Sequence, residues 1–429
     1  MRNLTLGLIA YRLLSRVATP LAPLLLRQRM LRGKEDPKRM AERLGYTTLP
    51  RPDGTLIWIH GVSVGESLAA LPLIEVLIRR PGRRILLTSG TVSSAQVLRE
   101  RLPPGVLHQF AVVDTPGAVI RFLEHWRPQI ALFVDSEIWP NALIEANHRN
   151  IPLALVNGRM SERSFTNWYR VRRSAEALMS AYDLCLVQDA RTANRLRLLG
   201  ATQVEITGSL KADAPVLPAD PGALDSLRQA IKARPVFLAA QTHPGEETTV
   251  FEVHDRLRQN FPQLLTIIVP RHPKRGAELL SQSGSRPTAR RAPGELPGSD
   301  TAIYLADTMG ELGLFYRVAR LAFIGGSLIP HGGQNPLEPA RLGCPLLAGP
   351  FTENFADAYR SVFAMQGLGR VEGADAICAL ASPFLADASY AQSIGARAEA
   401  GARSLAGAVA LTTQAIENVL HKAGLDARA

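Results

Sequence analysis

Short apolar runs alternate with longer amphipathic stretches through the first half of the chain. The apolar runs are bounded by turn-forming residues, which is typical of buried strands. The stretches between them, such as SLAALPLIEVLIRR and SSAQVLRERL, have the length and spacing of helices. Continuous apolar strands separated by helices predict a parallel sheet that is covered on both faces. We place its strands at 56–60, 84–89, 107–113, 130–135, 152–158, 184–188 and 204–208.

The alternation stops after Lys211 and resumes at residue 235. Four prolines in ADAPVLPADPGALDSLRQAIKARP mark this stretch as an interdomain linker with a short helix. Residues 281–300 are rich in Ser, Pro, Gly and Arg, and we expect a mobile insertion there. The second series of strands is predicted at 235–241, 264–270, 302–307, 321–327 and 345–350.

This organisation predicts an α/β protein with two doubly wound, Rossmann-like domains that face each other. Because ligands of open parallel sheets bind beyond the carboxyl ends of the strands, we expect the chemistry to lie between the two domains. We divide the chain into an N-terminal segment (1–35), a first domain (36–212), a linker (213–234), a second domain (235–385) and C-terminal helices (386–429).

The segment LAFIGGSLIPHGGQNPLEP, at 321–339, combines an apolar strand, four glycines and a helix start. Glycines between a strand and a helix let a ligand reach backbone N–H groups at the positive end of the helix dipole. The segment therefore predicts an anion site at the carboxyl edge of the second sheet. A well-capped helix after a flexible turn is the alternative.

Three helix starts share the spacing of a capping box, at 63–66, 308–311 and 335–338. In each, the glutamate could satisfy only the backbone of its own cap residue. Gly65 and Gly310 favour a ligand instead, because glycine within the first turn of a helix costs about 1 kcal/mol relative to alanine. A carboxylate at such a position can accept hydrogen bonds from sugar hydroxyls or act as a general base.

The N-terminus mixes leucines with arginines and is interrupted by Pro20 and Pro23. Neither apolar piece reaches the roughly 20 residues that a membrane-spanning helix needs. A segment that lies on an anionic membrane surface fits this pattern, while a buried amphipathic helix and a signal peptide are alternatives. The formal charge of +11 comes almost entirely from arginine, since only six residues are lysine. This charge leaves phosphorylated substrates, membranes and nucleic acid open as partners.

Polar clusters follow most of the predicted strands. Polar residues are common in loops, but five clusters at one edge of the sheets favour a site. They are Asp135-Ser136-Glu137, 157–161, 208–211, 241–247 and 270–273. The sequence contains no Cys/His set with metal-ligand spacing, no phosphate-binding P-loop and no complete GxGxxG motif.

The motifs HGVSVGE, SEIWPN, VPRHP, DTMGEL and GGQNPLEP, taken together, resemble the Kdo transferase family of lipopolysaccharide synthesis. Those enzymes transfer 3-deoxy-D-manno-oct-2-ulosonic acid (Kdo) from CMP-Kdo to a lipid A precursor. The resemblance covers nearly the whole chain and implies a GT-B fold without a cofactor or a metal at the transfer site. It also implies an enzyme on the cytoplasmic side of the inner membrane that binds no nucleic acid.

The resemblance assigns roles to individual residues. Glu66 matches the general base, and Glu137 and Lys211 match positions that stabilise the transition state. Glu338 is expected to bind ribose, and Arg271 and helix N-termini are expected to hold the phosphate. The CMP-binding positions are Pro270, Arg271, Met309, Gly310, Glu311, Asn335, Pro336, Leu337 and Glu338. Further candidates for substrate binding are Ser63, Gly65, Arg159, His243, Gly325 and Gly326.

The chain departs from the family pattern at Gly158, Met160, Ser209, Ala212 and Pro244. None of these departures removes a predicted catalytic group. They leave open the details of the acceptor and the number of sugars transferred. Two other functions remain open: a GT-B enzyme that uses a UDP-sugar, and a basic peripheral membrane or nucleic-acid-binding protein without activity.

Overall fold

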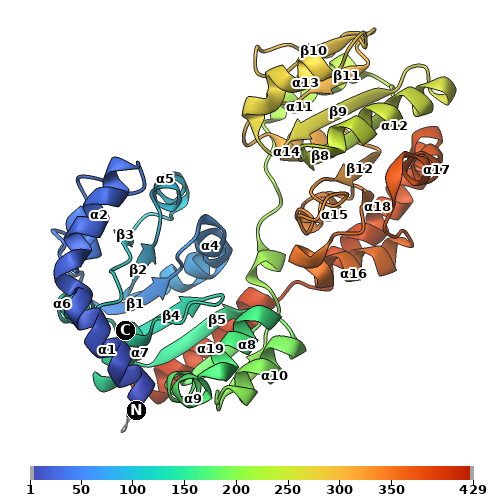
Figure 1. Cartoon of the computed structure of the whole chain (residues 1–429). Coiled ribbons are helices and arrows are strands. Elements are labelled where there is room, and N and C mark those ends of the chain that lie inside the picture. The colour runs from blue at the N-terminus through green and yellow to red at the C-terminus, as the bar shows by residue number, and fades with distance from the viewer. Residues whose placement is uncertain (1–3, 426–429) are drawn as a thin grey trace. The chain divides into compact units, whose positions relative to one another are not determined.

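The structure is a computed structural model that describes residues 4–425, and it divides into two compact units. Unit 1 comprises Met1–Ala214 and Ala406–Ala429, and unit 2 comprises Pro215–Leu405. Each unit is built around its own parallel sheet (Figure 1).

The sheet of unit 1 has seven strands in the order β3-β2-β1-β4-β5-β6-β7. All neighbouring strands are parallel. The strands are β1 (Thr55–His60), β2 (Arg83–Ser89), β3 (Val106–Phe110), β4 (Ile130–Val134), β5 (Leu153–Gly158), β6 (Leu184–Val187) and β7 (Val204–Ile206). After the N-terminal segment, the helices of this unit are α3 (Met40–Arg43), α4 (Val64–Ile78), α5 (Val92–Arg101), α6 (Pro116–Trp126), α7 (Pro140–His148), α8 (Glu162–Arg170), α9 (Arg172–Met179), α10 (Ala190–Leu198), the 3-10 turn η2 (Leu210–Asp213) and α19 (Ala408–Lys422).

Both faces of this sheet are buried, as the continuous apolar strands predict. Successive side chains of a strand point to opposite faces, so Trp58 packs in one apolar cluster and Ile57 and Ile59 in the other. The second cluster includes Ile416 and Leu420 of α19. Figure 1 shows this last helix, in red, among the elements of unit 1. The C-terminal stretch therefore completes the core of the unit that the N-terminal half builds.

The N-terminal segment is one continuous helical run. It consists of α1 (Leu6–Ala18), a 3-10 turn (Thr19–Leu21) and α2 (Ala22–Leu31). Pro20 and Pro23 do not break the run, contrary to our expectation, because both occupy first-turn positions where no N–H donor is needed. The combined helix is long and apolar enough to cross a membrane by length and composition, and only 11% of its most apolar window is buried. The alternative of a buried amphipathic helix is therefore wrong.

Polar contacts attach α1 to the body of unit 1. The Tyr11 hydroxyl donates a 2.9 Å hydrogen bond to Asp114 Oδ2. The hydroxyls of Thr5 and Ser174 are also hydrogen bonded, at 2.9 Å. The opposite side of the helical run exposes leucines that cover no other part of the described chain. Those more than half exposed are Leu6, Leu13, Leu14, Leu21, Leu24, Leu25 and Leu31.

The sheet of unit 2 has six parallel strands in the order β10-β11-β9-β8-β12-β13. The strands are β8 (Val236–Thr242), β9 (Leu265–Pro270), β10 (Thr288–Arg290), β11 (Ile303–Leu305), β12 (Leu321–Ile324) and β13 (Leu346–Ala348). The helices are α11 (Pro221–Ile231), α12 (Glu246–Asn260), α13 (Gly276–Gln282), α14 (Leu312–Tyr316), α15 (Leu337–Ala340), α16 (Ala356–Gln366), α17 (Gly373–Ala386) and α18 (Ala388–Arg403), with 3-10 turns at Pro273–Arg275 and Glu353–Phe355.

The segment 281–300 is an ordered part of this sheet, and the prediction of a mobile insertion is wrong. Its strand β10 pairs with β11 at the sheet edge. Arg290 forms an ion pair with the buried Asp307, whose Oδ1 also accepts a 2.9 Å hydrogen bond from the backbone N–H of Ala292. These contacts tie the polar segment to the carboxyl end of β11.

Candidate active site

The predicted catalytic residues of unit 1 gather where the order of its strands reverses. Strands β1 and β4 are neighbours, while the chain continues from β1 to β2 on one side and from β4 to β5 on the other. Such a switch point leaves a crevice at the carboxyl ends of the strands. Glu66 lies on the helix after β1, and Asp135 and Glu137 follow β4 directly. The topology therefore brings together carboxylates that lie about 70 residues apart in the chain.

Glu66 is held by a complete capping box at the start of α4, as predicted. Its Oε2 accepts hydrogen bonds from the backbone N–H groups of Val62, at 2.7 Å, and Ser63, at 3.2 Å. Its Oε1 accepts from the Ser63 hydroxyl at 2.7 Å. A Cβ at Gly65 would meet only the Ser63 Oγ, at 3.9 Å, so packing does not require glycine there. The half-buried carboxylate is thus fixed by three donors next to an open helix start.

Asp135 and Asn157 place Lys211 near this site. Both have left-handed backbone conformations, with φ of 62° and 55°, which Asp and Asn tolerate better than most residues. The Asn157 amide donates to Asp135 Oδ1, and its Oδ1 accepts a 2.9 Å hydrogen bond from the N–H of Leu210. Leu210 is the first residue of the 3-10 turn η2 that carries Lys211. Asn157 is a positioning residue that we did not predict, although Asn directly before Gly at a strand end is a signal for this backbone conformation.

The environment raises the pKa of two carboxyl groups at this site, Glu137 and Asp135. Burial raises the pKa of Glu137 to about 7; the Trp139 hydrogen bond opposes this, and the charges of Glu66 and Asp135 add to it. Burial also raises the pKa of Asp135, against the effect of the Lys211 charge. Carboxyl groups with shifted pKa values are typical of functional sites.

Arg159 follows β5 at the same edge. Its side chain is exposed, and its backbone carbonyl accepts a hydrogen bond from the Ser136 hydroxyl. The loop of Asp135-Ser136-Glu137 is thereby joined to the loop after β5, so two of the predicted polar clusters are in contact.

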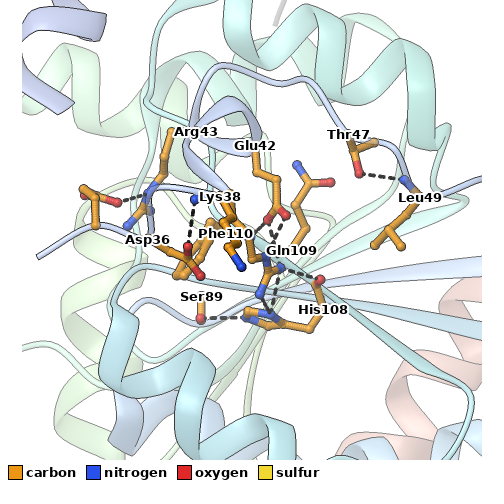
Figure 2. Close-up of polar contacts among 12 residues, drawn as sticks. Asp36, Lys38, Glu42, Arg43, Thr47, Leu49, Ser89, His108, Gln109 and Phe110 are labelled. Atoms are coloured by element: carbon orange, nitrogen blue, oxygen red, sulfur yellow. Dashed lines mark hydrogen bonds and ion pairs between the residues drawn. The ribbon is translucent and has the colours of Figure 1, made fainter. Parts of the chain in front are cut away.

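A polar network closes the neighbouring edge, at the carboxyl ends of β2 and β3. Figure 2 shows Glu42 beside Phe110, whose N–H donates to Glu42 Oε2 at 2.7 Å, and His108 beside Ser89. The Arg43 guanidinium lies over the Phe110 ring at 4.9 Å and donates to Ala111 O at 3.0 Å. Since Arg43 is also paired with buried Glu35, we interpret this network as structural.

The glycine loop of unit 2 does not form the anion site that we predicted. Strands β8 and β12 flank the switch point of this sheet, and the loop after β12 begins with Gly325-Gly326-Ser327. Its N–H groups point to a carboxylate of the chain itself. Glu246 Oε2 accepts from Gly326 at 2.7 Å, and Oε1 accepts from Ser327 and Leu328 at 3.0 Å each. Because Glu246 is buried and fills the loop, these donors cannot also bind an external anion.

Two glycines of this loop have separate structural roles. A Cβ at Gly325 would approach the carbonyl oxygen of Gln241 to 2.4 Å, so the two strand ends can come this close only without a side chain. Gly326 has a φ of 65° and its N–H faces Glu246. Their contribution to a ligand site is therefore indirect.

The helix predicted to start at 335–338 is shorter than expected. The helix α15 begins at Leu337 and has only four residues, so its dipole is small. Asn335 Oδ1 accepts a 3.1 Å hydrogen bond from the N–H of Leu337. Glu338 does not complete a capping box: its Oε2 accepts from Gln241 Nε2 at 3.0 Å, and burial raises its pKa. Pro336 caps the helix through its backbone alone.

The predicted helix start at 308–311 is wrong in position, because α14 begins at Leu312. Gly310 has a φ of 83°, so glycine is needed for a left-handed turn and not inside a helix. Glu311 forms a bidentate ion pair with Arg291, at 2.6 and 3.1 Å, which holds the pKa of this carboxyl below its usual range. Met309 is 74% exposed beside it. Arg291 belongs to the segment that we took for a mobile insertion, and no local signal indicates its partner.

Pro270 and Arg271 end β9 and begin the next loop. The Arg271 N–H donates to Thr242 O at 2.9 Å, which joins this loop to the end of β8. His243 follows β8 and is buried. Among residues 4–425, no group of three or more His, Cys, Asp or Glu side chains is arranged to hold a metal ion. The expectation of metal-free transfer stays a prediction.

Comparison with known proteins decides the family. Residues 38–214 match the family described as 3-Deoxy-D-manno-octulosonic-acid transferase (kdotransferase). The chain is 35% identical over 351 residues to the 3-deoxy-D-manno-octulosonic acid transferase of Haemophilus influenzae, and the match covers 79% of this chain and 82% of that protein. This chain belongs to the Kdo transferase family. Kdo transferase activity in lipopolysaccharide biosynthesis is the activity of this family, and the resemblance drawn from the motifs is confirmed.

Other members and folds agree with this assignment. The Kdo transferase chain is 37% identical over 372 residues to the probable mitochondrial 3-deoxy-D-manno-octulosonic acid transferase of Arabidopsis thaliana, with 83% of each chain covered. A solved structure of UDP-GlcNAc 2-epimerase from Neisseria meningitidis superimposes with a TM-score of 0.57, at 14% identity, over 85% of this chain and 100% of that chain. The latter likeness concerns the fold alone. It confirms the GT-B class, with its two Rossmann-like units and parallel sheets.

Proposed function

We propose that this Kdo transferase uses CMP-Kdo as donor and a lipid A precursor, lipid IVA, as acceptor, with Glu66 as the general base. The placement of Glu66 carries the proposal. Three donors fix its carboxylate at a helix start, and among residues 4–425 one of its oxygens, Oε1, is engaged only by the Ser63 hydroxyl. A carboxylate held in this way can take the proton of an acceptor hydroxyl as that oxygen attacks the anomeric carbon.

The neighbouring groups support the same reaction. A hydroxyl activated by one base displaces CMP directly, so the configuration at the anomeric carbon is inverted. Lys211, placed by Asn157, supplies positive charge for the transition state. Burial raises the pKa of Glu137 to about 7, so this carboxyl group can hold a proton near neutral pH and donate a hydrogen bond. This suits a role other than that of a general base.

The donor is assigned to unit 2. Glu338 and Asn335 offer hydrogen-bonding groups for ribose beside Gln241. Arg271 supplies positive charge for the phosphate. Met309 and Glu311 lie after β11, and Arg291, the ion-pair partner of Glu311, follows β10. No metal takes part in this proposal, because arginine and lysine side chains would neutralise the charge that develops on the leaving phosphate.

We further propose that the protein works on the cytoplasmic face of the inner membrane. The helical run Leu6–Leu31 presents an apolar side to solvent and carries arginines that suit anionic lipid. Its polar contacts with unit 1 support this proposal, because they would hold unit 1 close to the bilayer in which a lipid acceptor resides.

Glu66→Gln is a more specific test of the general-base role than Glu66→Ala. Glutamine retains the capping box but cannot act as a base. We expect kcat to fall by about 10²–10⁴-fold while CMP affinity stays unchanged. Glu75→Gln, an exposed position on the same helix, is the matched control and should keep full activity.

The assay combines purified protein with tetra-acylated lipid A precursor and either CMP-Kdo or UDP-sugars. Mass spectrometry of the product reports the donor, the acceptor and the number of sugars. Full turnover by Glu66→Gln would contradict the base assignment. Transfer from a UDP-sugar alone would overturn the donor.

A further inference from the structure

Three histidines converge at the carboxyl edge of the sheet of unit 2. His243 follows β8, His272 follows β9, and His331 lies in the loop after β12. These three strands are adjacent in the sheet, and β8 and β12 flank its switch point. The ring centroids of His243 and His331 are 4.1 Å apart, and those of His243 and His272 are 6.2 Å apart. Three of the nine histidines of the chain thus share one site.

The backbone around the cluster is fixed. The His243 N–H donates to Glu246 Oε2 at 2.9 Å. The carbonyl of His331 accepts a 2.9 Å hydrogen bond from Asn354 Nδ2. Gln334 Nε2 lies 3.0 Å from His243 Nε2. The rings are therefore presented by an ordered frame, and a ligand does not have to assemble the site.

The charges around His243 are mainly positive. The groups that face it are His331, His272 and Arg271, with Glu246 as the only acidic one among the described residues that act on it. Both oxygens of Glu246 already accept backbone N–H groups. Burial lowers the pKa of His243, and the neighbouring His331 lowers it further. An anion placed between these rings would relieve the repulsion.

The plugged glycine loop leaves a nucleotide phosphate in need of another partner. The N–H groups after β12 are occupied by Glu246, and α15 is too short to supply a strong dipole. Side chains must then neutralise the phosphate. Arg271 and the three imidazoles, whose N–H groups can donate to an anion, are the groups that the topology brings to the switch point, where ligands of such sheets bind.

We propose that His243, His272 and His331, together with Arg271, bind the phosphate of the nucleotide donor and take up a proton as it binds. The proposal rests on the proposed function, because it places the donor in unit 2. Imidazolium N–H groups form charge-assisted hydrogen bonds to phosphate oxygens. The bound anion raises the affinity of the rings for protons, so nucleotide affinity increases as the pH falls toward 6.

Calorimetry with CMP and with cytidine, between pH 6.5 and 8.5, tests the cluster. Two buffers of different ionisation enthalpy report proton uptake. For the intact protein we expect CMP to bind more tightly at pH 6.5 than at pH 8.5, with proton uptake. Cytidine lacks the phosphate and should show neither effect.

The informative variants are His331→Gln and His272→Gln, whose native side chains are exposed, so that folding is preserved. Each should weaken CMP binding at pH 6.5 by about tenfold, the size of one charge-assisted hydrogen bond. Each should also reduce proton uptake. His148→Gln, at an exposed position in unit 1, is the control. The second ionisation of the CMP phosphate contributes equally to the pH dependence of binding by the intact protein and by each variant. It therefore cancels when the variants are compared with the intact protein.

The proposal is overturned if both variants bind CMP like the intact protein at pH 6.5, or if cytidine shows the same pH dependence. Binding of UMP in place of CMP, with the expected pH dependence and loss in the variants, would support the cluster and overturn CMP as the donor nucleotide. The two proposals can therefore fail separately.

Discussion

Removing the carboxylate of Glu246 should destabilise unit 2 more than any exposed substitution on the same helix. This side chain is 1% exposed and accepts four backbone hydrogen bonds. The donors are His243 at 2.9 Å, Gly326 at 2.7 Å, and Ser327 and Leu328 at 3.0 Å each. The carboxylate thus joins the loop after β8 to the loop after β12.

The size of the effect follows from these four bonds. A buried N–H that loses its partner costs about 1–3 kcal/mol, so Glu246→Ala should cost at least about 4 kcal/mol even at the lower limit. This approaches the ~5–15 kcal/mol by which whole domains are stable. Glu246→Gln keeps one acceptor oxygen and turns an amide NH₂ toward two donors, so about half of the loss, ~2 kcal/mol, is expected.

Hydrogen exchange of peptides that cover 236–246 and 321–328 measures this loss locally. Protection should fall by about 10³-fold in Glu246→Ala and about 30-fold in Glu246→Gln. All four tryptophans lie in unit 1, so their fluorescence should stay unchanged and shows that unit 1 remains folded. Glu252→Ala, at an exposed position on α12, is the control. Unchanged protection of 326–328 in Glu246→Ala would refute the reasoning.

Three other predictions follow from the geometry. In the intact protein, the free energy of unfolding should fall as the pH rises from 4.5 to 7, because folded Glu137, with a pKa of about 7, still holds a proton that the unfolded carboxyl group has released. Glu137→Gln should remove this pH dependence, and urea unfolding at pH 5 and pH 7.5 measures it. Arg291→Ala should weaken CMP binding in calorimetry by about tenfold, because it removes the ion pair that holds Glu311, a predicted CMP-binding residue. Arg286→Ala breaks a similar bidentate pair with Asp255 and should leave CMP binding unchanged. Equal effects of the two substitutions would contradict a local role of Arg291. Leu14→Glu should reduce the sedimentation of the protein with anionic vesicles. Leu198→Glu, at a similarly exposed position on α10, is the control and should not reduce it. Unchanged sedimentation of Leu14→Glu would argue against the helical run as the membrane contact.

The strands could be predicted because their signal is local and strong. Ile130–Val134 is a continuous apolar run, and its full burial is what such a run requires. Strand β10 escaped prediction because Thr288–Arg290 is short, polar and half-buried at the sheet edge. Such a strand exists because of its neighbour β11, and its own three residues carry no hydrophobic pattern.

The partners of the glutamates were harder to predict. Ser63 and Glu66 satisfy each other within one helical turn, so their spacing is sufficient evidence. Glu311 has the same spacing from Thr308 and accepts a hydrogen bond from its hydroxyl, but it also forms an ion pair with Arg291, and Gly310 turns the backbone away from a helix. The spacing of a capping box shows only which hydrogen bonds can form within one helical turn. The actual partner depends on which charged residue the fold brings near, and that information lies elsewhere in the chain.

Glu66 and Glu246 show how similar placements produce different chemistry. Each lies in the first turn of the helix after the first strand of its sheet, and each accepts N–H groups from the preceding loop. Glu246 is buried and also binds the loop after β12, so both of its oxygens serve the fold. Glu66 is half-buried, and its Oε1 is engaged by a single hydroxyl that can rotate away. The glutamate whose hydrogen bonds are incomplete is the one that can receive a proton from a substrate, which is why we propose the base in unit 1.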